Sequence, residues 1–130
     1  MSFILSKSDA NYDSAEYLSQ GGYFASSIHC AYYSCLQLMI FIYKKEKGTD
    51  PNFDSFGVNE KGFHNYLFNC VIQLIKNKNQ IRTLNTYFGD LKRSRVKSDY
   101  YDNEIKPVES TEALKKSRYL RSVLKKEFNT

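Results

Sequence analysis

The chain has 130 residues and a formal net charge of +5, which is an ordinary size for one domain. Its hydrophobic content is 42%, with nine Phe and eleven Tyr, and a disordered protein would contain far fewer aromatic residues. Its three cysteines, at positions 30, 35 and 70, show no CxxC spacing, which argues against a disulfide framework and a zinc site. We therefore expect one domain over residues 1–130, with reduced thiols, no metal and no cofactor, in the cytoplasm.

Two short apolar stretches bear on the location of the chain. Residues 3–5 are too few for the hydrophobic core of a signal peptide, and no basic segment precedes them. Residues 28–43 are interrupted by Ser34 and Gln37 and are short for a membrane span. We expect no membrane association.

The first helix is expected over residues 6–19, followed by a glycine pair at 21–22 that is typical of a helix end. Its apolar stripe is weak, which predicts a peripheral position. The second helix is expected over residues 22–47 and is apolar nearly all round, which is typical of a central helix or of one that faces both a core and a partner. One face carries Ile28, Ala31, Tyr32, Cys35, Met39 and Ile42, and the next carries His29, Tyr33, Leu36, Ile40 and Tyr43.

After a loop at residues 48–57, a third helix is expected over 59–77 and a fourth over 80–98. A fifth is expected to start at a cap formed by Ser110 or Thr111. No segment has the pattern of a β-strand. Helices of these lengths with short connections predict an all-α fold, an antiparallel up-and-down bundle of four to five helices that dimerises.

The fourth helix places an arginine on its apolar face. Ile81, Leu84, Phe88 and Leu91 follow one another by three or four residues, and the next position in that series is Arg95. A buried arginine needs a partner, and Asp99, four residues later, is the natural one. Two interpretations remain open: an ion pair that only fixes the end of the helix, or a guanidinium held at a cleft to bind a phosphate.

Familiar catalytic motifs are missing from the sequence. It has no phosphate-binding glycine loop, no GxSxG, no HExxH and no paired carboxylates of the di-iron type. His29 and His64 are the only histidines. We expect His64 to be a hydrogen-bonded, half-buried side chain rather than a ligand or a catalytic group.

Two segments resemble HEPN domains (higher eukaryote and prokaryote nucleotide-binding). Residues 23–36, Tyr-Phe-Ala-Ser-Ser-Ile-His-Cys-Ala-Tyr-Tyr-Ser-Cys-Leu, resemble the "G-Y-x-x-A…A-Y-Y" second helix of that family. Residues 95–100, Arg-Val-Lys-Ser-Asp-Tyr, resemble the "R-x-x-A-D-Y" signature of its small stand-alone bacterial members, with Ser98 in place of Ala. His64 lies where such proteins often carry a histidine that opens the third helix. The resemblance extends over most of the chain.

The resemblance implies a dimerising helical bundle, often encoded beside a minimal nucleotidyltransferase. Many HEPN proteins are metal-independent ribonucleases of toxin–antitoxin or defence systems, with an Arg followed four to six residues later by a His. The corresponding positions here, 98–102, hold no His. The candidate catalytic residues are therefore Arg95, carried over directly, with Asp99 and Tyr100 as the subgroup's equivalents. The candidate phosphate or RNA contacts are Arg93, Lys97, His29 and Tyr33, of which His29 is also a candidate for the missing proton-transfer group.

Three hypotheses follow. The first is a protein that binds RNA or nucleotide phosphate at a dimer cleft, with an atypical ribonuclease site. The second is a non-catalytic homodimeric module, or the helical partner of a nucleotidyltransferase antitoxin. The third is an unrelated helical bundle whose tyrosines belong only to the core.

Overall fold

The computed structural model describes residues 2–53 and 60–130, and in that part of the chain every regular element is helical. The predicted all-helical class is thus confirmed. The elements are α1 (Phe3–Gln20), α2 (Phe24–Lys47), α3 (Glu60–Leu74), the short 3-10 helix η2 (Lys78–Gln80), α4 (Ile81–Tyr100) and α5 (Pro107–Glu127). Residues 54–57 of the predicted loop and residue 59, the predicted start of the third helix, lie outside the described residues.

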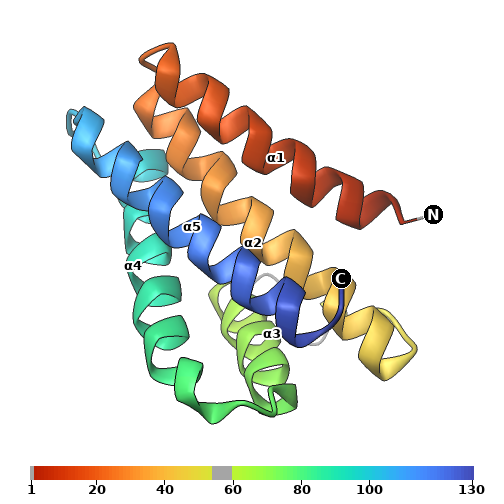
Figure 1. Ribbon diagram of the computed structural model, residues 1–130. Coiled ribbons are helices and arrows are strands. Elements are labelled where there is room, and N and C mark those ends of the chain that lie inside the picture. Colours follow the sequence, from red (N-terminus) through yellow and green to blue (C-terminus); the bar gives the residue numbers. More distant parts are fainter. Residues whose placement is uncertain (1, 54–59) are drawn as a thin grey trace.

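Helix α2 occupies the centre of the bundle. It contacts α1, α3, α4 and α5, with α1 along one edge and α3 and α4 on the other side (Figure 1). The face predicted to be apolar is fully buried, including Tyr32 and Met39, and Leu36 on the neighbouring face is buried as well. The rest of that neighbouring face is half-buried, except for the exposed His29. The central position predicted for this helix is confirmed.

Helices α2 and α5 run side by side in the same direction (Figure 1). Their contacting residues keep a constant spacing in the sequence, in the pairs Ser27 with Ser110, Ser34 with Ser117 and Lys45 with Phe128. By contrast α3 and α4 are antiparallel, because contacts of later α3 residues fall on earlier α4 residues: Asn65 with Lys92, then Phe68 with Phe88. The strict alternation of an up-and-down bundle is therefore interrupted.

Buried serines line the interface of α1, α2 and α5. Ser27 Oγ donates to the carbonyl of Ala15 on α1 at 2.7 Å, and Ser117 Oγ on α5 donates to the carbonyl of Ala31 on α2 at 2.8 Å. Ser8 Oγ on α1 donates to the carbonyl of Ser34 at 2.6 Å. Small side chains allow helix backbones to approach closely, and each hydroxyl is satisfied by a neighbouring helix. The small, polar arc of α2 is thus an interior surface of the bundle.

The turn between α1 and α2 depends on Gly22. Its φ of +85° is in the left-handed region, where a side chain would be strained. Tyr23 N–H donates to the carbonyl of Leu18 at 2.8 Å and Gly22 N–H to that of Ser19 at 3.2 Å, the hydrogen-bond pattern of a Schellman motif. The predicted glycine-terminated helix end is confirmed, and it reverses the chain so that α1 lies along α2.

Three helix ends lie three or more residues from their predicted positions, and the others lie within two residues. Helix α1 starts at Phe3, because the Ser2 hydroxyl accepts from Leu5 N–H at 3.2 Å and caps it. Helix α3 ends at Leu74 rather than at residue 77. Helix α5 starts at Pro107, before the predicted caps Ser110 and Thr111, because proline suits the first helical position. Ser110 instead lies one turn inside α5, where its hydroxyl is within hydrogen-bond distance of those of Ser19, at 2.8 Å, and Ser27, at 3.1 Å.

Helix α2 is long and apolar enough to cross a membrane by length and composition, and it is the one such helix among the described residues. However, 56% of the apolar window is buried inside the bundle. The core helix of a soluble protein passes the same test, so this helix is consistent with a soluble protein.

The capping interaction at the start of α5 predicts a pH-dependent stability effect. The Glu109 carboxylate accepts from Lys106 N–H at 2.8 Å and from Lys97 Nζ at 2.6 Å. The first bond is the larger cause that lowers the pKa of Glu109 below its usual 4.5. Glu109→Ala should therefore lower the free energy of unfolding by about 1 kcal/mol at pH 7, measured in urea. Because the folded-state pKa is depressed, this stabilisation is present above pH 4.5 and is lost as the pH falls through the folded-state value.

The matched control is Glu112→Ala, which removes an exposed carboxylate from the next turn of α5. It should change the stability by less than about 0.5 kcal/mol. An equal loss in both variants, or a Glu109→Ala deficit that persists at pH 3, would contradict the capping role.

Candidate functional site

Arg95 is buried on the inner face of α4, with an exposed fraction of 3%. It continues the stripe of Leu84, Phe88 and Leu91 as the sequence predicted. Its Cζ lies 5.1 Å from the ring centre of Tyr32 and 5.5 Å from that of Tyr33, both on α2. Tyrosine faces attract a guanidinium through the negative potential of the ring. The arginine is thus held between α4 and the centre of α2.

Asp99 connects this arginine to the surface. Its Oδ2 lies 3.6 Å from Arg95 Nη1, so the predicted i, i+4 ion pair is confirmed. The same carboxylate contacts His29 of α2, with Nδ1 at 3.0 Å from Oδ1 and 2.9 Å from Oδ2. Arg95, Asp99 and His29 therefore form one charged cluster between the C-terminal turn of α4 and the N-terminal half of α2.

The contact with Asp99 sets the protonation pattern of the His29 ring. A carboxylate only accepts hydrogen bonds, so Nδ1 carries the proton and Nε2 is left as the basic nitrogen. The His29 side chain is 47% exposed, whereas that of Asp99 is 19% exposed. This is an arrangement by which a carboxylate can orient an imidazole.

The cluster opens onto a hollow of about 420 Å³. Its walls are Ala25, Ser26, His29 and Cys30 from α2, and Ser98 and Asp99 from α4. Within the described part of the chain, the buried hydroxyl of Ser98 has no hydrogen-bond partner, and such groups are rare inside proteins. The hollow thus places the exposed imidazole of His29 near a serine whose hydroxyl has no hydrogen-bond partner in the described part of the chain.

Cys30 is the other reactive side chain in the hollow. Burial, together with the negative charge of Asp99, raises the pKa of its thiol above the usual 9.0. A thiol, unlike a thiolate, is a poor nucleophile. His29 is therefore the better candidate for chemistry here.

The other predicted site residues lie around this cluster or away from it. The ring of Tyr33 packs against that of His29, with ring centres 4.7 Å apart and a tilt of 41° between the rings. The ring of the exposed Tyr100 lies 6.0 Å from Arg95 Cζ. Arg93 points to solvent and pairs with Asp90, and Lys97 pairs with Glu109 at 2.6 Å. Neither Arg93 nor Lys97 lines the hollow.

His64 lies behind the cluster, in the interior. Its Nδ1 is 2.7 Å from the Tyr32 hydroxyl, and its ring centre is 6.1 Å from that of Tyr33. The expected hydrogen bond is therefore present, although His64 is buried rather than half-buried. The two histidines of the chain thus flank Tyr33, a proximity that their separation in the sequence did not suggest.

Sequence reasoning missed a second buried arginine, Arg121 of α5. Its guanidinium donates to Asp9 Oδ1 at 2.6 Å and to the Ser8 hydroxyl, and Lys125 also reaches Asp9 at 3.1 Å. Burial raises the pKa of Asp9, but the hydrogen bonds from Arg121 and Lys125 outweigh it and keep the pKa below the usual 3.8. The cluster joins α1 to α5 and lies apart from the hollow's lining. No local pattern could have indicated it, because the partners come from opposite ends of the chain.

The described residues hold no group of three or more His, Cys, Asp or Glu side chains placed to bind a metal ion. In comparisons with known proteins, no family model, no curated protein and no solved structure matches the chain. The inference of function therefore depends on the cluster itself.

The burial of Arg95 predicts a large stability difference between two arginines of α4. Arg95→Ala should lower the free energy of unfolding by about 3 kcal/mol, because it removes aromatic packing and leaves Asp99 without its cation. Arg93→Ala, only two residues away but 74% exposed on its side chain, should change it by less than about 0.5 kcal/mol. Urea unfolding of both variants measures this, and comparable losses would contradict the buried role of Arg95.

Proposed function

We propose that the chain is a HEPN-like protein that binds RNA at the hollow beside His29 and cleaves it without a metal ion. The observation that carries the proposal is the 2.9 Å contact between His29 Nδ1 and Asp99. It supplies an oriented, solvent-facing imidazole, the general acid or base that the sequence lacks after Arg95. The net charge of +5 favours a polyanionic ligand.

In the proposed reaction, His29 Nε2 takes the proton of a ribose 2′-hydroxyl. The 2′ oxygen attacks the adjacent phosphorus, the bond from phosphorus to the 5′ oxygen breaks, and a 2′,3′-cyclic phosphate forms. The leaving 5′ oxygen needs a proton, and Tyr100, the exposed last residue of α4, is the candidate donor. Asp99 stabilises the imidazolium that appears on His29.

Arg95 is assigned a positioning role in this proposal. Its side chain is only 4% exposed and its guanidinium packs against Tyr32 and Tyr33, so it acts on the phosphate through Asp99 rather than by direct contact. The ion pair with the buried Arg95 fixes the position of the Asp99 carboxylate, and Asp99 in turn holds the His29 ring. This differs from a phosphate-gripping arginine, which needs an accessible guanidinium.

The reaction predicts which substitutions abolish activity. With a labelled RNA in EDTA, the native protein should release products that end in a cyclic phosphate. His29→Asn should lower the rate by about 10²–10⁴-fold, and Asp99→Asn by about 10–100-fold, because the ring loses its orientation.

The control for that assay is Arg82→Ala, an exposed cation at the other end of α4, which should leave the rate nearly unchanged. All variants are first compared by thermal unfolding. Cleavage that is unaffected by His29→Asn, or that needs a divalent metal, would overturn the ribonuclease proposal.

A second candidate function is a non-catalytic interaction module. Three exposed tyrosines favour it, since large exposed aromatic side chains are enriched at interfaces: Tyr23, Tyr100 and Tyr101. Tyr23 lines a second, smaller hollow at the start of α2, distinct from the hollow beside His29. Tyr100 is the last residue of α4, and Tyr101 caps that helix. In this proposal the chain forms a homodimer, or pairs with a nucleotidyltransferase antitoxin in the bacterial cytoplasm.

A double variant, Tyr100→Ser with Tyr101→Ser, tests this surface. Light scattering after size exclusion should show a dimer for the native protein at micromolar concentration and a monomer for the variant. The control is Tyr17→Ser, which removes an exposed tyrosine of α1 and should leave the dimer intact. A native monomer would refute the homodimer, and RNA binding without cleavage would favour the module over the nuclease.

A further inference from the structure

A larger apolar groove lies at the other end of α2, away from the candidate site. It has a volume of about 740 Å³ and lies between the start of α1, the last turns of α2 and the segment that follows α2. From His29 to Ile40 the helix rises by roughly 17 Å, at about 1.5 Å per residue. The groove is therefore separate from the His29 cluster, and the inference below does not depend on the proposed function.

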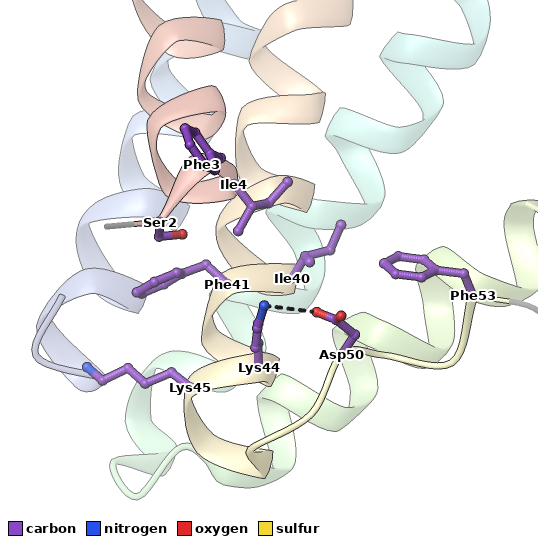
Figure 2. A pocket seen from close by; sticks show the side chains of 9 residues that line it. All are labelled: Ser2, Phe3, Ile4, Ile40, Phe41, Lys44, Lys45, Asp50 and Phe53. Atoms are coloured by element: carbon purple, nitrogen blue, oxygen red, sulfur yellow. Dashed lines mark ion pairs between the residues drawn. The ribbon is translucent and has the colours of Figure 1, made fainter.

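Five large apolar side chains form the walls of the groove. Figure 2 shows Phe3 and Ile4 on α1 above Ile40 and Phe41 on α2, with Phe53 beside Ile40 on the segment after the helix. Phe53 is held from behind by Phe63 of α3, with ring centres 5.1 Å apart. Phe3 and Phe53 are nevertheless 74% and 50% exposed, so this end of the bundle presents aromatic surface that the described chain does not cover.

The described residues that line the groove carry a net positive charge. Lys44 pairs with Asp50 at 3.5 Å, and both side chains are well exposed, so the pair is weak and an incoming anion can replace it. Lys45 also lines the groove, but its ammonium donates to the carbonyls of Phe128 and Asn129. These acceptors carry no net charge, so among the described lining residues two cations face one carboxylate.

We propose that this groove binds a single-chain amphiphile with a carboxylate head, that is, a fatty acid. The tail lies against Ile4, Ile40 and Phe53, and the carboxylate takes the place of Asp50 at Lys44. The volume lies within the range of small-ligand sites, roughly 300–1,000 Å³. An apolar wall with lysines at its rim matches an apolar body with one terminal anion. The net positive charge of the described lining residues disfavours a cationic amphiphile.

Binding is measured with the full chain, by isothermal titration with octanoate, decanoate and dodecanoate below their micellar concentrations. The affinity should rise roughly threefold to fourfold for each added methylene that is buried. Dodecyltrimethylammonium should bind at least tenfold more weakly than dodecanoate. No saturable binding of dodecanoate, or equal binding of the two head groups, would overturn the proposal.

Two surface variants locate the site. Lys44→Met keeps the aliphatic stem and removes the charge, so it should weaken dodecanoate binding about two- to fivefold and leave dodecanol binding unchanged. Phe3→Ser removes an exposed wall and should weaken both ligands. The matched control is Lys47→Met, an exposed lysine on the same turns of α2 that does not line the groove, and it should bind dodecanoate as the native protein does.

Two further outcomes would count against the fatty-acid site. If Lys47→Met weakens dodecanoate binding as much as Lys44→Met, the attraction is a general effect of charge. If the protein binds vesicles of phosphatidylglycerol but no monomeric carboxylate, this end of the bundle is a membrane-docking surface instead.

Discussion

A helix that is apolar around nearly its whole circumference must be covered on every side, and α2 imposes this constraint on the rest of the chain. It has 24 residues, of which ten are buried, and α1, α3, α4 and α5 all contact it. The bundle can be understood as the set of helices needed to remove α2 from water. Its burial supplies much of the hydrophobic free energy, since that energy scales with the apolar area removed from water.

The covering helices contact α2 through different chemistry. Helices α1 and α5 approach its small arc through serines whose hydroxyls bond backbone carbonyls across the interface. Helix α4 approaches its aromatic side with both leucines and a buried arginine. In the first type of contact, each of these buried serine hydroxyls has a hydrogen-bond partner. The second places charged groups at the edge of the core. There Asp99 contacts both the buried Arg95 and the exposed ring of His29.

The two ends of α2 are consequently different surfaces. Around His29 the walls are polar and titratable, so that end suits a ligand that exchanges protons or carries phosphate. Around Ile40 and Phe41 they are apolar with a cationic rim, which suits an apolar body with an anionic terminus. An ion pair costs much less to break when it is exposed than when it is buried. Lys44 is therefore free to change partner, whereas Arg95 is fixed.

The sequence by itself determined the helices, the central place of α2, the inward position of Arg95 and its pairing with Asp99. All of these follow from local periodicity, which repeats within a few residues. The sequence pattern misplaced the start of α5. Serine is a common capping residue, but Ser110 lies inside the helix and belongs to the serine interface with α2. Only the tertiary structure decided that His29 meets Asp99, that Arg121 meets Asp9, and that α2 and α5 run in the same direction. Each of these joins residues 70 or more positions apart, and such contacts depend on how whole helices pack rather than on any pattern within one of them.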